Sequence, residues 1–369
     1  LHENKGENGG GYDRHCRNLP KEEVERLLAA GTPYVIRQKM PTEGSTTFND
    51  VVYGPITIEN KELEDQILLK SDGFPTYNFA NVIDDHLMKI THVVRGCEYL
   101  TSTPKYNLLY EAFGWEVPTY IHLPLIMGKN ADGSVSKLSK RHGSTGFEDL
   151  VKEGYLPEVI VNYIALLGWC PKDNREIFTL DELIQNFSID GISKSPAVFD
   201  YEKLQWLNGE YLRAMTPEEF TRRAMPYYKE VFPKDERPWD VLTMILQPRV
   251  TRLTDIPEML GFFRELPDYP VELFVNKKSK TTLENSADML KAAIPVLQNL
   301  PEWTLNAIHD SMMDLVPKLG VKNGTLLWPV RIAASGQLVT PGGAFEILCI
   351  LGREESLRRL NLGLKKLGA

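Results

Sequence analysis

The pattern of hydrophobic and polar residues changes twice along the chain. Between residues 33 and 70, β-branched and aromatic residues alternate with polar ones in short runs, which is typical of antiparallel strands. We expect these strands at 34–37, 51–53, 56–58 and 66–69. After Pro75 the pattern predicts, in order, a helix at 77–88, a strand at 90–94, a helix at 104–113 and a strand from 120. Helices alternating with buried strands indicate a parallel α/β sheet.

From residue 147 onward, helical periodicity dominates. Short sequence signals mark several helix ends: Thr103 before Pro104 as a cap, Gly114 and Gly168 as stops, and capping boxes at 179–182 and 216–219. Two further helices are expected within 286–319, and the last helical stretch, 345–367, is interrupted at Gly352. The pattern therefore predicts a β-rich segment, part of an α/β domain, and a largely helical C-terminal half.

Composition and charge narrow the class of protein. The 369 residues carry 42 Lys and Arg against 50 Asp and Glu, with 42% hydrophobic residues, so we expect two to four domains at roughly 100–200 residues each. The longest apolar stretch, 159–170, is interrupted by Asn162 and falls short of the about 20 residues that cross a bilayer. No signal peptide is recognisable, and four scattered cysteines fit a reducing compartment, so a cytoplasmic protein without a membrane segment is expected. An acidic total charge still permits a local basic site for nucleic acid.

A basic stretch at 128–146 holds the most informative chemistry. Glycines at both ends indicate a mobile loop, and its centre carries Lys137, Lys140 and Arg141 among small hydroxyl residues. Ammonium groups on a loop can stabilise the charge that develops in phosphoryl or nucleotidyl transfer. On composition alone, a solvated basic loop is the other interpretation. The sequence contains neither a P-loop nor a GxGxxG motif.

The order of residues 137–141, Lys-Leu-Ser-Lys-Arg, resembles the KMSKS signature of class I aminoacyl-tRNA synthetases, in the variant that glutamyl-tRNA synthetases carry. We call residues 137–141 the signature loop. Five other segments resemble bacterial-type glutamyl-tRNA synthetases in the same order: 12–17, 71–88, 91–98, 199–209 and 328–333. The resemblance covers essentially the whole chain and implies a glutamate–tRNA ligase.

The resemblance implies a glutamate pocket, with Arg95 and Tyr77 at the side-chain carboxylate and Asn81 at the backbone end of the amino acid. The residues agree with this: Tyr77 and Asn81 are four apart and share one face of the expected helix. Arg95 follows an expected parallel strand, at the sheet edge where open α/β folds bind ligands. A guanidinium suits a carboxylate. The alternative is that Arg95 pairs structurally with Glu98.

For ATP, bound with Mg²⁺, the resemblance implies contacts from Glu98, Tyr99, Leu125, Ile126, Leu138 and Lys140. Lys137 and Lys140 are the expected catalytic residues, and no tightly bound cofactor is expected. The three apolar residues of this set could equally be ordinary core residues.

In the C-terminal half, the resemblance implies that Arg331, Thr340 and Pro341 face the anticodon, with Arg249 and Arg252 as weaker candidates. Unstacked bases can rest on a guanidinium plane, and a hydroxyl can read base edges. The alternative is a solvated Arg331 and a Thr340 that caps a helix.

No metal site is expected. Consecutive residues Asp84, Asp85 and His86 point in different directions on a helix, so a surface or structural role is favoured. Tyr12 and Cys16 resemble half of a zinc-binding element found in some family members. A single thiolate cannot complete a tetrahedral zinc site.

Family members carry a second ATP signature, His-x-Gly-His, near the N-terminus. None of the seven histidines here are three apart, and the chain starts at Leu1 in a Gly-rich segment. We therefore expect an N-terminally truncated chain that is inactive alone. The expected fold class is α/β plus all-α. Its layout is a remainder of the acceptor-stem-binding insertion (1–75), the second half of a Rossmann-like catalytic domain (76–127), the signature loop with a stem-contact region (128–210), and helical anticodon-binding domains (211–369).

The expected partners are ATP, L-glutamate and tRNA(Glu), bound by a monomer. A glutaminyl-tRNA synthetase would end in β-barrels, which the helical C-terminal pattern argues against. Two alternatives stay open: a non-catalytic tRNA-binding fragment, and an enzyme that also charges tRNA(Gln).

Overall fold

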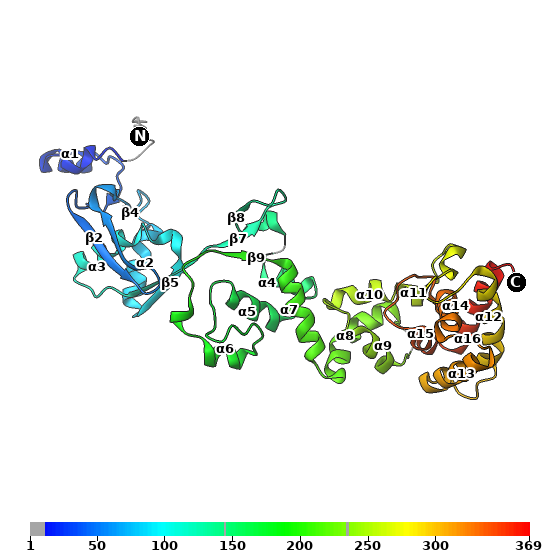
Figure 1. The fold of residues 1–369 in the computed structure, drawn as a ribbon. Coiled ribbons are helices and arrows are strands. Elements are labelled where there is room, and N and C mark those ends of the chain that lie inside the picture. The colour runs from blue at the N-terminus through cyan, green and yellow to red at the C-terminus, as the bar shows by residue number, and fades with distance from the viewer. Residues whose placement is uncertain (1–11, 144, 234–235) are drawn as a thin grey trace. The chain divides into compact units, whose positions relative to one another are not determined.

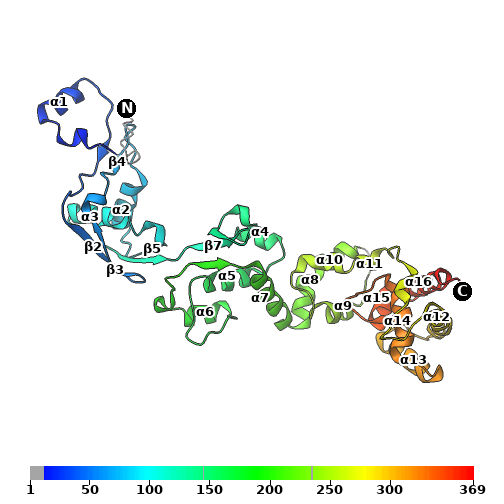
Figure 2. The ribbon, with the colours of Figure 1, turned by 45° about the horizontal axis from the view of Figure 1, so that its top comes forward.

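The computed structural model describes residues 12–143, 145–233 and 236–369. The Gly-rich opening at 1–11 lies outside the described residues. The chain divides into two compact units, one formed by residues 1–143 and 164–199 and the other by residues 144–163 and 200–369. The first unit contains the strands and the second is helical (Figures 1 and 2).

A four-stranded sheet with the order β3-β2-β6-β5 forms the centre of the first unit. Its strands are β2 (Ser45–Asp50), β3 (Gly54–Glu59), β5 (His92–Gly96) and β6 (Thr119–Leu123). Strand β6 runs parallel to both β5 and β2, while β2 and β3 form an antiparallel hairpin. Helices α2 (Tyr77–Leu87) and α3 (Thr103–Phe113) pack together through Val82, Tyr106, Leu109 and Tyr110. The predicted alternation of helices and parallel strands is confirmed.

Two smaller sheets complete the strands of this unit. Strands β1 (Ile36–Arg37) and β4 (Ile67–Leu69) pair antiparallel. Strands β7 (Ile126–Lys129), β8 (Val135–Lys137) and β9 (Ala197–Phe199) form a sheet with the order β8-β7-β9. The stretch 128–146 is therefore not a loop throughout, because its first part forms the β7–β8 hairpin. Short helices α1 (Lys21–Ala29) and α6 (Leu180–Asn186) also belong to this unit.

Three local predictions are wrong in detail. Residues 51–53 form the turn of the β2–β3 hairpin and not a strand, because the Asp50 carboxylate accepts the backbone N–H groups of Val52 and Tyr53. Thr103 is the first residue of α3 and not its cap, and its hydroxyl donates to the Tyr99 carbonyl. At α8 the Thr216 hydroxyl accepts the N–H of Glu219 as expected. The box is not closed, because the Glu219 carboxylate binds two arginines.

Helices account for the regular structure of the second unit. They are α4 (Phe147–Lys152), α5 (Pro157–Leu166), α7 (Tyr201–Ala214), α8 (Pro217–Val231), α9 (Trp239–Leu246), α10 (Ile256–Met259), α11 (Gly261–Arg264), α12 (Leu283–Gln298), α13 (Leu305–Lys318), α14 (Asn323–Ser335), α15 (Ala344–Leu351) and α16 (Arg353–Lys366). Helices α12, α14 and α16 pack against one another, as Figures 1 and 2 show. The predicted helical C-terminal half and the break at Gly352 are confirmed.

Candidate active site

Arg95 lies near the carboxyl end of β5, surrounded by aromatic rings. Its guanidinium carbon is 4.9 Å from the ring centre of Tyr99, 4.6 Å from that of Tyr106 and 5.5 Å from that of Tyr120. Burial raises the pKa of the Tyr106 and Tyr120 phenols, so both rings stay neutral beside the cation. One hydrogen bond, 3.4 Å long, joins Arg95 Nη2 to the Thr103 hydroxyl. The Nε atom of Arg95 is buried and has no hydrogen-bond partner among the described residues.

The structural pairing of Arg95 with Glu98 does not occur. The Glu98 carboxylate instead accepts a hydrogen bond from Lys137 Nζ at 3.1 Å, which links the short helix after β5 to the end of β8. Its own backbone N–H and then Lys137 hold the pKa of Glu98 below its ordinary value. Within the described ranges, no carboxylate lies within ion-pair distance of Arg95. The guanidinium is therefore left with its charge uncompensated by a direct partner.

Helix α2 carries the other two candidates for the glutamate pocket. The side-chain oxygen Oδ1 of Asn81 is buried and lacks a hydrogen-bond partner within the described chain. The Tyr77 ring is 60% exposed and lies 6.3 Å from the Tyr99 ring, centre to centre. A ligand is one explanation for a buried polar atom without a partner. Buried atoms of this kind also occur on side chains outside the candidate pocket, so the two here support a ligand only together with the uncompensated charge of Arg95. The free acceptor on Asn81 and the free donor on Arg95 match the ammonium and carboxylate groups of an amino acid.

Asp50 and His122 form a buried pair beside Arg95 on the sheet. The sequence did not predict this pair. His122 is opposite Arg95 in the β5–β6 register and is fully buried. Its backbone N–H and its ring atom Nδ1 both lie at Asp50 Oδ2, at 3.0 and 2.7 Å. Burial lowers the pKa of His122, although Asp50 opposes this shift. The two residues are 72 positions apart, so no local pattern could have linked them.

The signature loop begins at the end of β8. The Leu138 N–H donates to the Ile126 carbonyl at 2.9 Å, which brings two of the apolar ATP candidates together. Leu125 and Ile126 are both half-buried. Lys140 begins a short 3-10 turn, Lys140–His142, and its side chain lies outside what the structure describes. Hydrogen bonds thus join the signature loop to two other segments of the first unit. Leu138 connects it to Ile126 of β7, and Lys137 connects it to Glu98 after β5.

Arg331 in α14 is anchored and not solvated. Its guanidinium donates to the Thr340 hydroxyl at 3.0 Å and to the Leu338 carbonyl at 3.1 Å, and its carbon lies 4.6 Å from the Trp328 ring centre. Burial lowers the pKa of Arg331. Thr340 donates to the Gly342 carbonyl, while the cap of α15 is Gly343, so the helix-capping interpretation of Thr340 is wrong. Pro341 is buried.

Arg249, Arg252 and His86 have structural partners. Arg252 pairs with Asp255 at 2.8 Å, and Arg249 donates to the Ile245 carbonyl. The His86 ring stacks on Trp115 with centres 3.8 Å apart. No group of three or more His, Cys, Asp or Glu side chains that could hold a metal occurs in the described residues.

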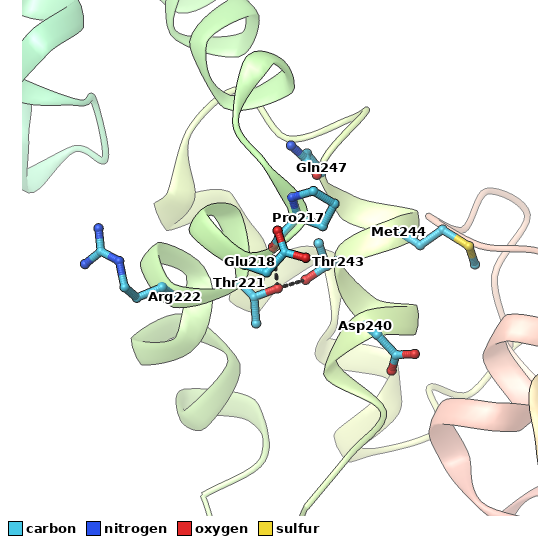
Figure 3. Close-up of a pocket in the computed structure, with 8 residues that line it drawn as sticks. All are labelled: Pro217, Glu218, Thr221, Arg222, Asp240, Thr243, Met244 and Gln247. Atoms are coloured by element: carbon cyan, nitrogen blue, oxygen red, sulfur yellow. Dashed lines mark hydrogen bonds between the residues drawn. The ribbon is translucent and has the colours of Figure 1, made fainter.

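A separate groove of about 660 Å³ lies between α8 and α9 (Figure 3). The hydroxyls of Thr221 and Thr243 bond to each other at 2.6 Å, and the Gln247 amide donates to the carbonyls of Leu212 and Met215. These polar groups are therefore already satisfied by the protein. The groove holds none of the candidate residues.

Two family models and many curated proteins match this chain. The family described as "tRNA synthetases class I (E and Q), catalytic domain" matches residues 2–206, and an anticodon binding domain family matches residues 219–364. The chain is 55% identical over 356 residues to the glutamate–tRNA ligase of Clostridium acetobutylicum, covering 96% of this chain and 73% of that protein. It is 56% identical to the glutamate–tRNA ligase of Clostridium kluyveri, covering 96% of this chain and 72% of that protein.

A solved structure agrees with these sequence relatives. The crystal structure of a glutamate tRNA ligase from Elizabethkingia meningosepticum, in complex with its amino acid, matches with a TM-score of 0.83 and 34% identity. The match covers 97% of this chain and 74% of that one. No helix in the described part of this chain is long and apolar enough to cross a membrane.

Proposed function

The chain belongs to the glutamate–tRNA ligases, a family of class I aminoacyl-tRNA synthetases, and on that premise we propose how its residues take part in joining glutamate to tRNA(Glu). In this reaction the α-carboxylate of glutamate attacks the α-phosphate of ATP and pyrophosphate leaves. The glutamyl group then passes from the adenylate to the terminal ribose of the tRNA. The part of the chain that contains the strands matches the catalytic-domain family, and the helical C-terminal part matches the anticodon-binding family.

The glutamate side chain binds at Arg95 in this proposal, with Tyr77 beside it and Asn81 at the ammonium end. The observation that carries the assignment is the pair of unpartnered buried atoms, Arg95 Nε and Asn81 Oδ1. Leaving a buried donor or acceptor unpaired costs about 1–3 kcal/mol, which a bound amino acid would offset. The tyrosine rings exclude water from the guanidinium and so strengthen its attraction for a carboxylate.

ATP binds in this proposal along the segment after β5 and the β7–β8 hairpin, with contacts from Glu98, Tyr99, Leu125, Ile126, Leu138 and Lys140. Lys140 stabilises the charge of the pentacovalent phosphate and Lys137 supports the loop, so catalysis is mainly positioning and electrostatics. The Lys137–Glu98 hydrogen bond supports this role, since it ties the loop to the segment that follows Arg95. Mg²⁺ accompanies the phosphates of ATP. The described residues offer no cluster to hold it, and no step is assigned to a protein-bound metal.

ATP–pyrophosphate exchange tests the proposal. We expect no exchange from the 369-residue chain, because its sequence lacks the His-x-Gly-His signature. We expect exchange from an extended enzyme, in which the N-terminal segment of the Clostridium acetobutylicum ligase, with its expected His-x-Gly-His signature, is fused ahead of this chain. Exchange by the chain alone would refute the expected inactivity.

Two substitutions in the extended enzyme separate the assigned roles. Arg95→Ala removes a charge-assisted contact of roughly 1.5–3 kcal/mol and should raise the KM for glutamate about 10- to 100-fold, with ATP binding nearly intact. Lys140→Ala should lower kcat about 10²- to 10³-fold with little change in glutamate affinity. A loss of ATP binding in Arg95→Ala, or an unchanged kcat in Lys140→Ala, would contradict the assignment concerned.

A tRNA-binding protein without catalysis is the second candidate, favoured by the absent His-x-Gly-His sequence. It predicts tRNA binding without exchange activity even from the extended enzyme. The proposal further includes a monomeric state and a location in the cytoplasm. The four free cysteines support the location, since free thiols fit a reducing compartment. Charging assays with tRNA(Glu) and tRNA(Gln) determine whether both are substrates.

A further inference from the structure

The imidazole ring of His142 rests on the backbone of Gly128. Gly128 is buried in the middle strand of the three-stranded sheet, where it is paired with Ser136 of β8 and Phe199 of β9. A Cβ atom at Gly128 would lie 2.5 Å from Cγ of His142 and 2.6 Å from its Cδ2. A glycine at this position therefore provides the space in which the ring lies.

Hydrogen bonds fix the ring on both sides. The backbone N–H of Ser139 donates to Nδ1 at 3.1 Å, and the hydroxyl and carbonyl oxygens of Ser139 each lie 3.2 Å from the same nitrogen. In the tautomer that accepts the Ser139 N–H at Nδ1, the ring proton is on Nε2 and is donated to Asn130 Oδ1, 2.9 Å away. The Ser136 hydroxyl lies 3.2 Å from both Nε2 and Asn130 Oδ1. His142 thus contacts the residues on either side of Lys137 and Leu138.

The partners of His142 are themselves oriented. The Asn130 amide donates to the Ser134 hydroxyl at 2.9 Å, which in turn donates to Asp132 Oδ1 at 2.6 Å. The hydrogen bonds form a continuous chain from the Ser139 N–H to the Asp132 carboxylate, in which Asn130 and Ser134 each accept one bond and donate the next. The tip of the β7–β8 hairpin and the start of the signature loop are therefore joined through one imidazole ring.

We propose that His142 is a positioning residue for the signature loop. Its imidazole ring, which lies against Gly128, holds residues 136–139 in one conformation. That conformation keeps Lys137 within 3.1 Å of Glu98 and fixes the backbone from which the turn at Lys140 starts. The role in catalysis rests on the proposed function, whereas the hold on the loop is a property of the chain itself and is tested without catalysis.

Trypsin provides the first test, because it cleaves after Lys137, Lys140 and Arg141. His142→Ala should raise the rate of cleavage within the loop about tenfold, the effect of losing one to two hydrogen bonds. His142→Asn keeps an acceptor near the Nδ1 position and should restore part of the protection. His92→Ala, a change at an exposed histidine of the same unit, is the control and should leave loop cleavage unchanged. Equal cleavage of the wild-type and His142→Ala loops would overturn the proposal.

Gly128→Ala is the second test, since it displaces the ring without removing it. Alone it should increase loop cleavage as His142→Ala does. Combined with His142→Ala it should add no further increase, because the clashing ring is gone. Additive effects would mean that Gly128 acts through the sheet and not through His142.

The ring nitrogens give a spectroscopic test. A two-dimensional ¹H–¹⁵N spectrum of the histidine rings, recorded where the ring is neutral, should show His142 as the Nε2–H tautomer. Gly128→Ala should shift it toward the tautomer mixture of a free imidazole. A Nδ1–H ring in the wild type would overturn the proposal. None of these results depends on the glutamate or ATP assignments. The proposal for His142 can therefore fail while the proposed function stands, and the reverse also holds.

Discussion

Replacing Arg331 by alanine should have two separable effects, one on stability and one on tRNA recognition. The guanidinium holds the segment after α14 through hydrogen bonds to Thr340 and Leu338, and it stacks on Trp328. At about 1 kcal/mol for each partly exposed hydrogen bond and about 0.5–1 kcal/mol for the cation–π contact, Arg331→Ala should cost about 2–3 kcal/mol of unfolding free energy. A solvated arginine would cost almost nothing.

Arg353 offers a matched control in the same unit. It donates to the Leu300 carbonyl at 2.7 Å and lies 5.5 Å from the ring centre of Trp303. Arg353→Ala thus removes the same kind of contacts, with an expected cost of about 1–2 kcal/mol. The family resemblance assigns it no role at the anticodon. Urea denaturation of the 369-residue chain measures both costs.

Binding of tRNA(Glu), compared with the same tRNA carrying an altered anticodon, isolates recognition from stability. The chain should bind tRNA(Glu) with an affinity that falls as salt rises. If Arg331 contacts a base, Arg331→Ala should weaken binding of tRNA(Glu) about tenfold and binding of the altered tRNA much less. Arg353→Ala should leave the ratio of the two affinities unchanged. An equal loss for both tRNAs would mean that Arg331 reaches only backbone phosphate, and a ratio changed equally by Arg353→Ala would refute the reasoning.

Three further predictions concern other arginine contacts. In the extended enzyme, Thr103→Val should raise the glutamate KM several-fold and not that of ATP, because its hydroxyl is a hydrogen-bond partner of Arg95. Thr103→Ser should restore the wild-type value, and an equal rise in both constants would contradict this. Arg359 is 1% exposed and donates to three backbone carbonyls. Arg359→Ala should therefore cost about 3–5 kcal/mol, against less than about 1 kcal/mol for the exposed Arg358→Ala; similar urea midpoints would refute the difference. Hydrogen bonds from Arg358 and Arg359 lower the pKa of Glu355 to about 2. The stabilising effect of the ionised Glu355 is thus complete at neutral pH and is lost as pH falls from about 4.5 toward about 2. In Glu355→Gln, the urea midpoint should therefore vary less with pH over that range than in the wild type.

Some features that depend only on neighbouring residues follow directly from the sequence. The capping box at 179–182 forms as expected, with the Thr179 hydroxyl accepting the N–H of Glu182 and the Glu182 carboxylate accepting that of Thr179. The long C-terminal helices and the break at Gly352 follow from periodicity and glycine alone. These features need only contacts within a few residues, which a local pattern contains.

Features that depend on distant contacts were missed or wrong. The turn at 51–53 is closed locally by the Asp50 carboxylate, whereas the contact of Asp50 with His122, 72 positions away on another strand, lies outside any local pattern. The tyrosines around Arg95 come from three separate elements, so no spacing in the sequence relates them. The anchoring of Arg331 by Leu338 and Thr340 was likewise invisible, since it depends on how the chain turns after α14.

Gly96 allows the position that Glu98 takes instead of pairing with Arg95. Three positions of separation made a pair between Arg95 and Glu98 plausible from the sequence. In the structure, the Glu98 carboxylate folds back over Gly96, where any Cβ would overlap it, and binds Lys137 of the signature loop. The Glu98 carboxylate is therefore used to hold the loop, and the guanidinium has no ion-pair partner among the described residues. An unpaired charge there lowers the stability of the protein by itself, and a ligand carboxylate is what would compensate it.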